Sequence, residues 1–168
     1  NKINKSIINL DSNSIFTKNY NNNPKQITKK INTFLKKNDS RIGIGLYKEK
    51  RNVYHGNNFI SNFNSKNRRD IHLGIDIFAP VGTKIKAPHD GKVFILKYNS
   101  FKYDYGPTIV LEHKIDKINK FYTIYGHLSK KCLKNLKVGQ KIKKNQLIAD
   151  IGNYPINGNW PPHLHFQL

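Results

Sequence analysis

From residue 71 onward, short apolar runs alternate with turn residues, and this rhythm most constrains what the chain can fold into. Such spacing is typical of antiparallel strands, and 11 Gly, 7 Pro and 9 Tyr favour a β-rich fold over a helical bundle. We therefore expect a mainly β protein, an antiparallel β-sandwich with a short N-terminal helix region. The expected strands are 71–78, 84–87, 91–98, 108–113, 121–126, 141–143, 146–151 and 163–168.

The first 70 residues have a different pattern. Asn23 is a preferred N-cap and Pro24 a preferred first helical residue, and apolar side chains follow at helical spacing. This predicts one amphipathic helix at 24–37, and alternating apolar residues predict a strand at 41–47. We expect the Asn-rich stretches to be irregular at 1–22 and a loop at 56–70. Residues 1–70 would then be an N-terminal extension to a domain at 71–168, whose C-terminal end we expect to be truncated.

A short internal echo lies within the second region. The six residues Val81–Lys86 match Val138–Lys143 at five positions, and both segments place a Gly turn before a predicted strand. The pattern fits either an internal duplication or two unrelated hairpin entries.

One group of possible ligands is His72-Leu-Gly-Ile-Asp76. In an extended strand this even spacing places His72 and Asp76 on one face, with Leu73 and Ile75 pointing into apolar packing on the other. Gly74 leaves room on the polar face for an ion or a close backbone.

A second group is His163-Leu-His165, which follows a double proline. Its spacing of two again places both imidazoles on one strand face, with Leu164 and Phe166 opposite. Zinc catalysis needs three protein ligands of N and O type and one open position, which two His and one Asp supply. The spacing does not decide which of His163 and His165 is the ligand.

Other catalytic chemistries fit the sequence less well. It contains no His-Glu-x-x-His motif and only two glutamates, Glu49 and Glu112, which excludes a helical zinc protease. Cys132 is the only cysteine, so it forms no intrachain disulfide, and no base lies near it in sequence. No Gly-x-Ser-x-Gly elbow occurs.

The net charge of +20 admits nucleic acid, an anionic membrane or an anionic polymer as partners. Residues 1–70 hold 15 basic and 4 acidic side chains, and residues 71–168 hold 15 and 6. The charge is spread over the chain and is nearly all Lys, whereas Arg is the usual residue for reading bases. We expect no specific nucleic-acid partner and no membrane span.

Six ordered segments resemble the lysostaphin-type zinc endopeptidases, over roughly residues 71–168. They are His72–Asp76, Ala79–Thr83, Ala87–Val93, Tyr125–Ser129, Val138–Gln140 and Pro162–Phe166. The resemblance implies a small antiparallel sandwich of the duplicated hybrid motif type, in which the internal echo is a repeated hairpin unit. It also implies one zinc ion per chain and hydrolysis of peptide bonds in peptidoglycan cross-bridges or stem peptides.

The resemblance also implies roles for five residues. His72, Asp76 and His165 would hold zinc, and His127 and His163 would be the catalytic histidines. Four aromatic residues are expected in core or loop packing, with lining of the groove as the alternative: Phe78, Tyr98, Tyr103 and Tyr105. Three further histidines are expected to be surface or structural residues: His55, His89 and His113.

Two departures from the family pattern bear on the substrate. Trp160 and two prolines replace the usual small-residue approach to the His-x-His pair, and Gln167 stands where a Glu is common. The chain also resembles a branch in which this domain lies inside a longer protein beside a kinase-like module and a class III aminotransferase. The alternative function is therefore a non-catalytic peptide-binding or regulatory domain. The expected compartment is extracytoplasmic for a wall-active enzyme and cytoplasmic for such a fusion.

Overall fold

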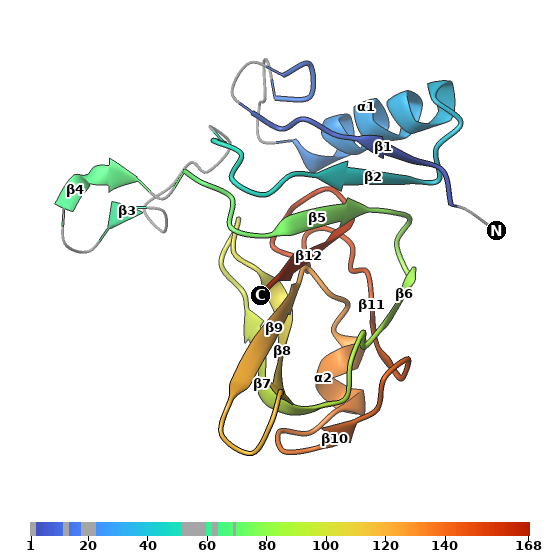
Figure 1. The fold of residues 1–168 in the computed structure, drawn as a ribbon. Helices are drawn as coiled ribbons and strands as arrows, with labels where there is room; N and C mark the ends of the chain where they lie inside the picture. Colours follow the sequence, from blue (N-terminus) through green and yellow to red (C-terminus); the bar gives the residue numbers. More distant parts are fainter. Residues whose placement is uncertain (1–2, 12–13, 18–22, 52–59, 62–63, 69) are drawn as a thin grey trace. The chain divides into compact units, whose positions relative to one another are not determined.

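The computed structural model describes residues 3–11, 14–17, 23–51, 60–61, 64–68 and 70–168 (Figure 1). It divides the chain into two compact units, Asn1–Asp76 and Ile77–Leu168, with the boundary inside a strand. Among the described residues, no helix has the length and apolar character that crossing a membrane requires.

The first unit combines one long helix with short strands. In it β1 and β2 pair in parallel, and β3 and β4 form an antiparallel hairpin. Strand β5 crosses the boundary between the units. The elements are β1 (Lys5–Ile7), α1 (Pro24–Lys37), β2 (Ile42–Gly45), β3 (Ile60–Ser61), β4 (Asn64–Arg68) and β5 (Ile75–Phe78).

Helix α1 confirms the predicted span of 24–37. The Asn23 side chain accepts hydrogen bonds from the backbone N–H groups of Lys25 at 3.0 Å and Gln26 at 3.4 Å, which satisfies donors that a helix start leaves open. The apolar positions at helical spacing are the buried ones: Ile27, Ile31 and Leu35. Burial of this stripe holds α1 in the first unit.

Two predictions for the first 70 residues are wrong. The stretch 1–22 contains β1, and the expected loop at 56–70 contains β3 and β4. Strand β1 forms its hydrogen bonds with β2, and the paired residues are more than 30 positions apart in the sequence. Local composition carries little information about such pairing, because strand formation depends on the neighbouring strand.

The second unit confirms every strand predicted beyond β5. Strands β12, β9, β8, β7 and β10 pair antiparallel in that order, and β6 pairs with β11 in a separate antiparallel sheet. The one short helix, α2 (Lys131–Asn135), was not predicted. The strands are β6 (Lys84–Lys86), β7 (Gly91–Asn99), β8 (Gly106–Lys114), β9 (Lys120–Gly126), β10 (Lys141–Ile142), β11 (Leu147–Asp150) and β12 (His163–Gln167).

A single apolar core joins the two sheets of this unit. Buried side chains of β6 and β11, such as Ile85 and Ile148, belong to the same cluster as Val93, Ile109 and Leu111 of the large sheet. Strand β8 lies between β7 and β9, and all but two of its nine residues are buried. The mainly β, two-layer expectation is therefore confirmed.

The internal echo occupies equivalent positions in the fold. Gly82 and Gly139 adopt φ of +82° and +85° in the turns before β6 and β10, a conformation that glycine adopts without strain. Ile85 and Ile142, which match within the echo, are both buried in the core cluster. Each of the two matching segments therefore places one apolar side chain in the core, directly after a turn that contains glycine.

We expect Leu111→Ala to lower the free energy of unfolding of the second unit by about 2–5 kcal/mol, because it opens a cavity at a fully buried position. Fluorescence of Trp160, the only tryptophan, reports unfolding of this unit in urea. Ile118→Ala, at an 86% exposed position, is the control and should change stability by less than about 0.5 kcal/mol. Equal effects of the two substitutions would contradict this account of the core.

Candidate metal centre and active site

The segment that carries His72 and Asp76 is extended, but only its second half is a strand. Strand β5 begins at Ile75, so the expectation that both residues lie within one strand is wrong for His72. Burial nevertheless alternates, with His72 and Asp76 only 2% and 1% exposed. Leu73 is 54% exposed, so it does not enter the apolar packing expected of it. The polar face of this segment is the buried one.

Three hydrogen bonds to backbone groups hold His72 from a neighbouring segment. Lys48 N donates to His72 O at 2.8 Å, His72 N donates to Glu49 O at 2.9 Å, and Nδ1 of the His72 ring lies 2.8 Å from Leu46 O. A carbonyl only accepts, so Nδ1 carries a proton, and in a neutral ring the lone pair is then on Nε2. A carboxylate oxygen also only accepts, so a contact between it and Nε2 requires a proton or a cation. Nε2 lies 3.1 Å from Asp76 Oδ1.

His163 and His165 lie on β12, as predicted. Both are 4% exposed, Leu164 enters the core cluster and Phe166 packs against it. Nδ1 of His163 donates to Pro161 O at 2.6 Å, and its ring stacks on Phe78 with centroids 5.0 Å apart. The double proline therefore supplies the carbonyl that fixes the His163 ring.

His165 has a different partner from His163. Its Nε2 lies 3.4 Å from Oε1 of Gln167, two residues along β12. An amide oxygen is an acceptor, so this contact favours the tautomer with Nε2–H and leaves the lone pair on Nδ1.

His127 is fixed by two connections of the second unit, one before β8 and one between β11 and β12. It follows β9 with a φ of +62°, which is uncommon for a residue other than glycine and often marks a functional position. Its backbone N–H donates to Tyr105 O at 2.7 Å, and its O accepts from Gly152 N at 2.9 Å. Nδ1 of its ring donates to Asn157 O at 2.8 Å, so Nε2 again keeps the lone pair.

Three histidines of the second unit, His127, His163 and His165, form one cluster. The ring centroid of His127 lies 4.3 Å from that of His163 and 6.1 Å from that of His165. The ring of Tyr105 stacks on His127 at 5.8 Å and meets His165 edge-on at 5.1 Å. Gly126 makes this approach possible, because a Cβ there would lie 2.7 Å from Cδ1 of Tyr105.

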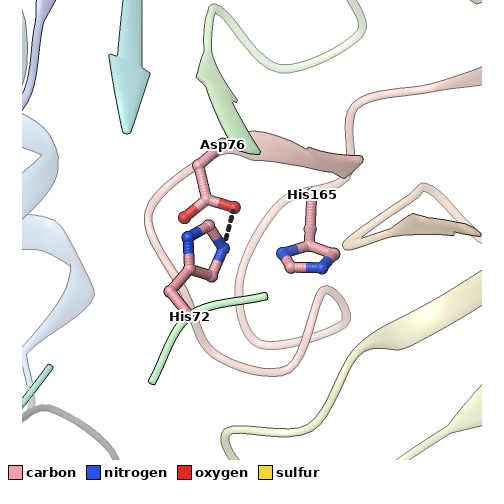
Figure 2. A group of neighbouring side chains, drawn as sticks. All are labelled: His72, Asp76 and His165. Carbon is pink, nitrogen blue, oxygen red and sulfur yellow. Dashed lines mark ion pairs between the residues drawn. The ribbon is translucent and has the colours of Figure 1, made fainter. Parts of the chain in front are cut away.

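His72, Asp76 and His165 satisfy the requirements of a zinc site in donor type and spacing. One ligand atom from each lies within 4.8 Å of the other two, and Figure 2 shows the three side chains together. The 3.1 Å between His72 Nε2 and Asp76 Oδ1 is close to the roughly 3.3 Å that separates two ligands of one tetrahedral zinc. Two imidazoles and one carboxylate are typical of a catalytic zinc site.

Comparison with known proteins places this chain in a family. The profile of Peptidase family M23 matches residues 70–168, more than half of the chain. The chain belongs to peptidase family M23. The resemblance to lysostaphin-type enzymes inferred from the motifs is thereby confirmed.

Three relatives show how similar the sequence of this M23 chain is to those of named endopeptidases. The peptidoglycan DD-endopeptidase ShyC of Vibrio cholerae is 33% identical over 64% of this chain and 24% of its own length. Lysostaphin of Staphylococcus staphylolyticus is 36% identical over 58% of this chain and 18% of its own length. The L-Ala–D-Glu endopeptidase of Bacillus subtilis is 33% identical over 60% of this chain and 30% of its own length. The chain thus spans less than a third of the length of these relatives.

The remaining histidines and the cysteine lie elsewhere. His89 is exposed, whereas His113 is fully buried and bonded to Asp90 O and Thr123 Oγ1, which confirms surface and structural roles. His55 lies outside the described residues. Burial raises the pKa of the Cys132 thiol to about 11, so the thiol is protonated at neutral pH and is a poor nucleophile.

Sequence reasoning missed the residues that hold the histidines and Asp76 in place. Arg51 donates to Asp76 and Glu49, while Asn157 supplies the carbonyl for His127. Tyr105 was assigned to packing, and its packing partners are His127 and His165. The only local signal was Glu49-x-Arg51, two opposite charges on one face of an extended segment.

The Asn157 side chain closes the loop whose backbone carbonyl, Asn157 O, holds the His127 ring. Its Nδ2 donates to Trp160 O at 2.9 Å and its Oδ1 accepts from Trp160 N at 3.2 Å, with Asn157 fully buried. Asn157→Ala should lower the free energy of unfolding by about 1–3 kcal/mol, because buried backbone groups lose their partner. Urea unfolding followed by Trp160 fluorescence measures this.

Asn153→Ala is the matched control, at an exposed position of the same loop where the side chain accepts from Tyr154 N. It should change stability by less than about 0.5 kcal/mol. If both variants unfold at the same urea concentration as the parent chain, the Asn157 side chain does not hold this loop.

Proposed function

We propose that this chain is a zinc-dependent endopeptidase that hydrolyses peptide bonds of peptidoglycan cross-bridges or stem peptides. The observation that carries the proposal is a complete donor set, His72, Asp76 and His165, in a chain of peptidase family M23. Two further buried histidines, His127 and His163, lie in one cluster with His165. A non-catalytic peptide-binding domain has no need for either of them.

Zinc bound at these three residues would supply Lewis-acid chemistry, lowering the pKa of a water molecule and polarising the scissile carbonyl. The protein contributes the orientation of its ligands. In the proposed assignment, His72 binds through Nε2 because Leu46 O holds its Nδ1–H. His165 binds through Nδ1, because Gln167 accepts from Nε2.

The proton transfers fall to His127 and His163 in this proposal. The described site offers no glutamate near them, so imidazole is the available acid and base. Both rings have Nδ1–H bonded to a backbone carbonyl, so Nε2 is the atom that takes or gives a proton. A neutral Nε2 accepts the proton of the attacking water, and a protonated Nε2 donates to the oxyanion that develops on the carbonyl. One histidine in each state fills both roles.

The names of the relatives support a class of substrate, but they do not identify the peptide bond that is cut. ShyC is named for DD-bonds and the Bacillus subtilis relative for the L-Ala–D-Glu bond, and both are about equally similar to this chain. We therefore propose a cell-wall peptide substrate without choosing the bond. A wall substrate implies an extracytoplasmic site of action.

The deciding experiment is mass spectrometry of cross-linked muropeptides incubated with the purified, zinc-loaded chain, with a chelated sample as control. We expect new peptide fragments that disappear on chelation and return when zinc is added back. A chain that holds zinc yet leaves every muropeptide intact would contradict the proposal and favour the regulatory alternative.

The proposed roles separate the two histidines of β12. His165→Ala should lose both bound zinc and activity, because it removes a ligand. His163→Ala should keep one zinc per chain and lose about 10²–10⁴-fold in rate, because it removes a proton-transfer group. Zinc is measured by atomic absorption after dialysis and activity on the muropeptides. His89→Ala, at an exposed position, is the control. Equal zinc loss in both β12 variants would refute the division of roles.

A further inference from the structure

The segment 46–51 runs beside 70–72 as a short ladder within the first unit. Lys48 N bonds to His72 O, His72 N to Glu49 O, and Arg51 N to Asp70 O at 2.7 Å. Lys50 and Ile71 form an antiparallel bridge in the same stretch. Segment 46–51 lies outside the part of the chain that the family profile matches, which begins at residue 70.

Arg51 is buried between two carboxylates. Its Nη1 lies 2.5 Å from Asp76 Oδ2, and its Nη2 and Nε lie 2.7 and 3.1 Å from Glu49 Oε2. The side chains of all three residues are no more than 8% exposed. Glu49 Oε1 also accepts from Leu10 N at 3.1 Å, which fixes the far end of the network. A buried charge of this kind persists only with its partners in place.

The two oxygens of Asp76 have different partners as a result. Arg51 holds Oδ2, while Oδ1 lies 3.1 Å from His72 Nε2. The guanidinium is a planar fork, so its contacts to Glu49 set the direction of the Nη1–H that meets Asp76. This constraint favours Oδ1 as the single oxygen available to a metal.

We propose that Arg51, anchored by Glu49, is a positioning residue that orients Asp76 as a one-oxygen ligand, and that segment 46–51 is part of the metal centre. The same segment holds the second ligand, since Leu46 O accepts from the His72 ring. The inference rests on the zinc ligands of the proposed function. In this proposal residues 46–51 support the metal site. They do not block the site, as an inhibitory N-terminal extension would.

Replacing Arg51 alone with a neutral residue is a poor test, because it leaves the Glu49 carboxylate buried without its cation and risks unfolding. The double variant Glu49→Gln with Arg51→Met removes one charge of each sign. The Glu49→Gln change keeps the contact to Leu10, since an amide oxygen still accepts from Leu10 N. Arg51→Lys is the second variant, because a lysine keeps the charge but lacks the fork that bridges both carboxylates.

The experiment measures zinc affinity of the full chain by chelator competition, together with the visible absorption of bound Co²⁺. The double variant should bind zinc about 10–100-fold more weakly, as loss of groups that orient ligands typically causes. Its Co²⁺ bands should weaken, because an unrestrained Asp76 binds through two oxygens and raises the coordination number. Arg51→Lys should fall between the double variant and the parent chain.

Lys50→Met is the matched control, since its ion pair with Asp70 is on the surface of the same segment. It should leave affinity and spectrum unchanged. Circular dichroism confirms that each variant is folded, and if the double variant is not, Arg51→Lys decides. A parent chain that binds zinc, with folded Arg51 variants that match it in affinity and Co²⁺ spectrum, overturns the positioning role and leaves the proposed function intact. A parent chain that binds no zinc overturns both.

Discussion

Three histidines of the site each donate one ring N–H to a backbone carbonyl, and the architecture of the site depends on that constraint. The acceptors are Leu46 O for His72, Asn157 O for His127 and Pro161 O for His163. A buried imidazole without such a partner is costly, and with it the ring has one tautomer and one orientation. In each case Nδ1 donates to that carbonyl, so Nε2 is the ring nitrogen that a metal or a transferred proton would meet. The backbone thereby decides the chemistry of each ring before any ligand is present.

This arrangement explains why loops distant in sequence belong to the site. The carbonyl for His72 comes from 26 residues upstream and that for His127 from 30 residues downstream. Neither loop can vary independently of its histidine. The loop at 153–160 is closed by the Asn157 side chain, and segment 46–51 is tied to 70–72 by its own hydrogen bonds. The apolar core below holds β9 and β12 in register, which fixes His127 and His165 relative to one another.

Local patterns predicted the parts of the structure that local physics controls. Short apolar runs separated by turn residues predicted every strand of the second unit, and the Asn23 cap with a helical apolar stripe predicted α1. Pairing between distant segments gave no such signal, so β1 and the β3–β4 hairpin were missed. The spacing of His72, Asp76, His163 and His165 identified candidates for the site, while their separate roles came from the family resemblance and remain predictions. The contacts of Arg51, Tyr105 and Asn157 with the site were not predicted, because these residues act on others at least 20 positions away in sequence.

The departures from the family pattern lie against the same histidines. Gln167 accepts from His165 Nε2 where a glutamate is common, and an amide oxygen makes this contact without adding a negative charge beside a proposed ligand. Trp160 replaces a small residue, and its ring lies 6.2 Å from that of His127. Its backbone is bonded to the side chain of Asn157, whose own carbonyl holds the His127 ring. The backbone of this segment is therefore connected to His127, the proposed proton-transfer residue, through the side chain and the carbonyl of Asn157. These hydrogen bonds use the backbone of Trp160, so a substitution of its side chain leaves them available and acts on His127 first through the contact between the two rings.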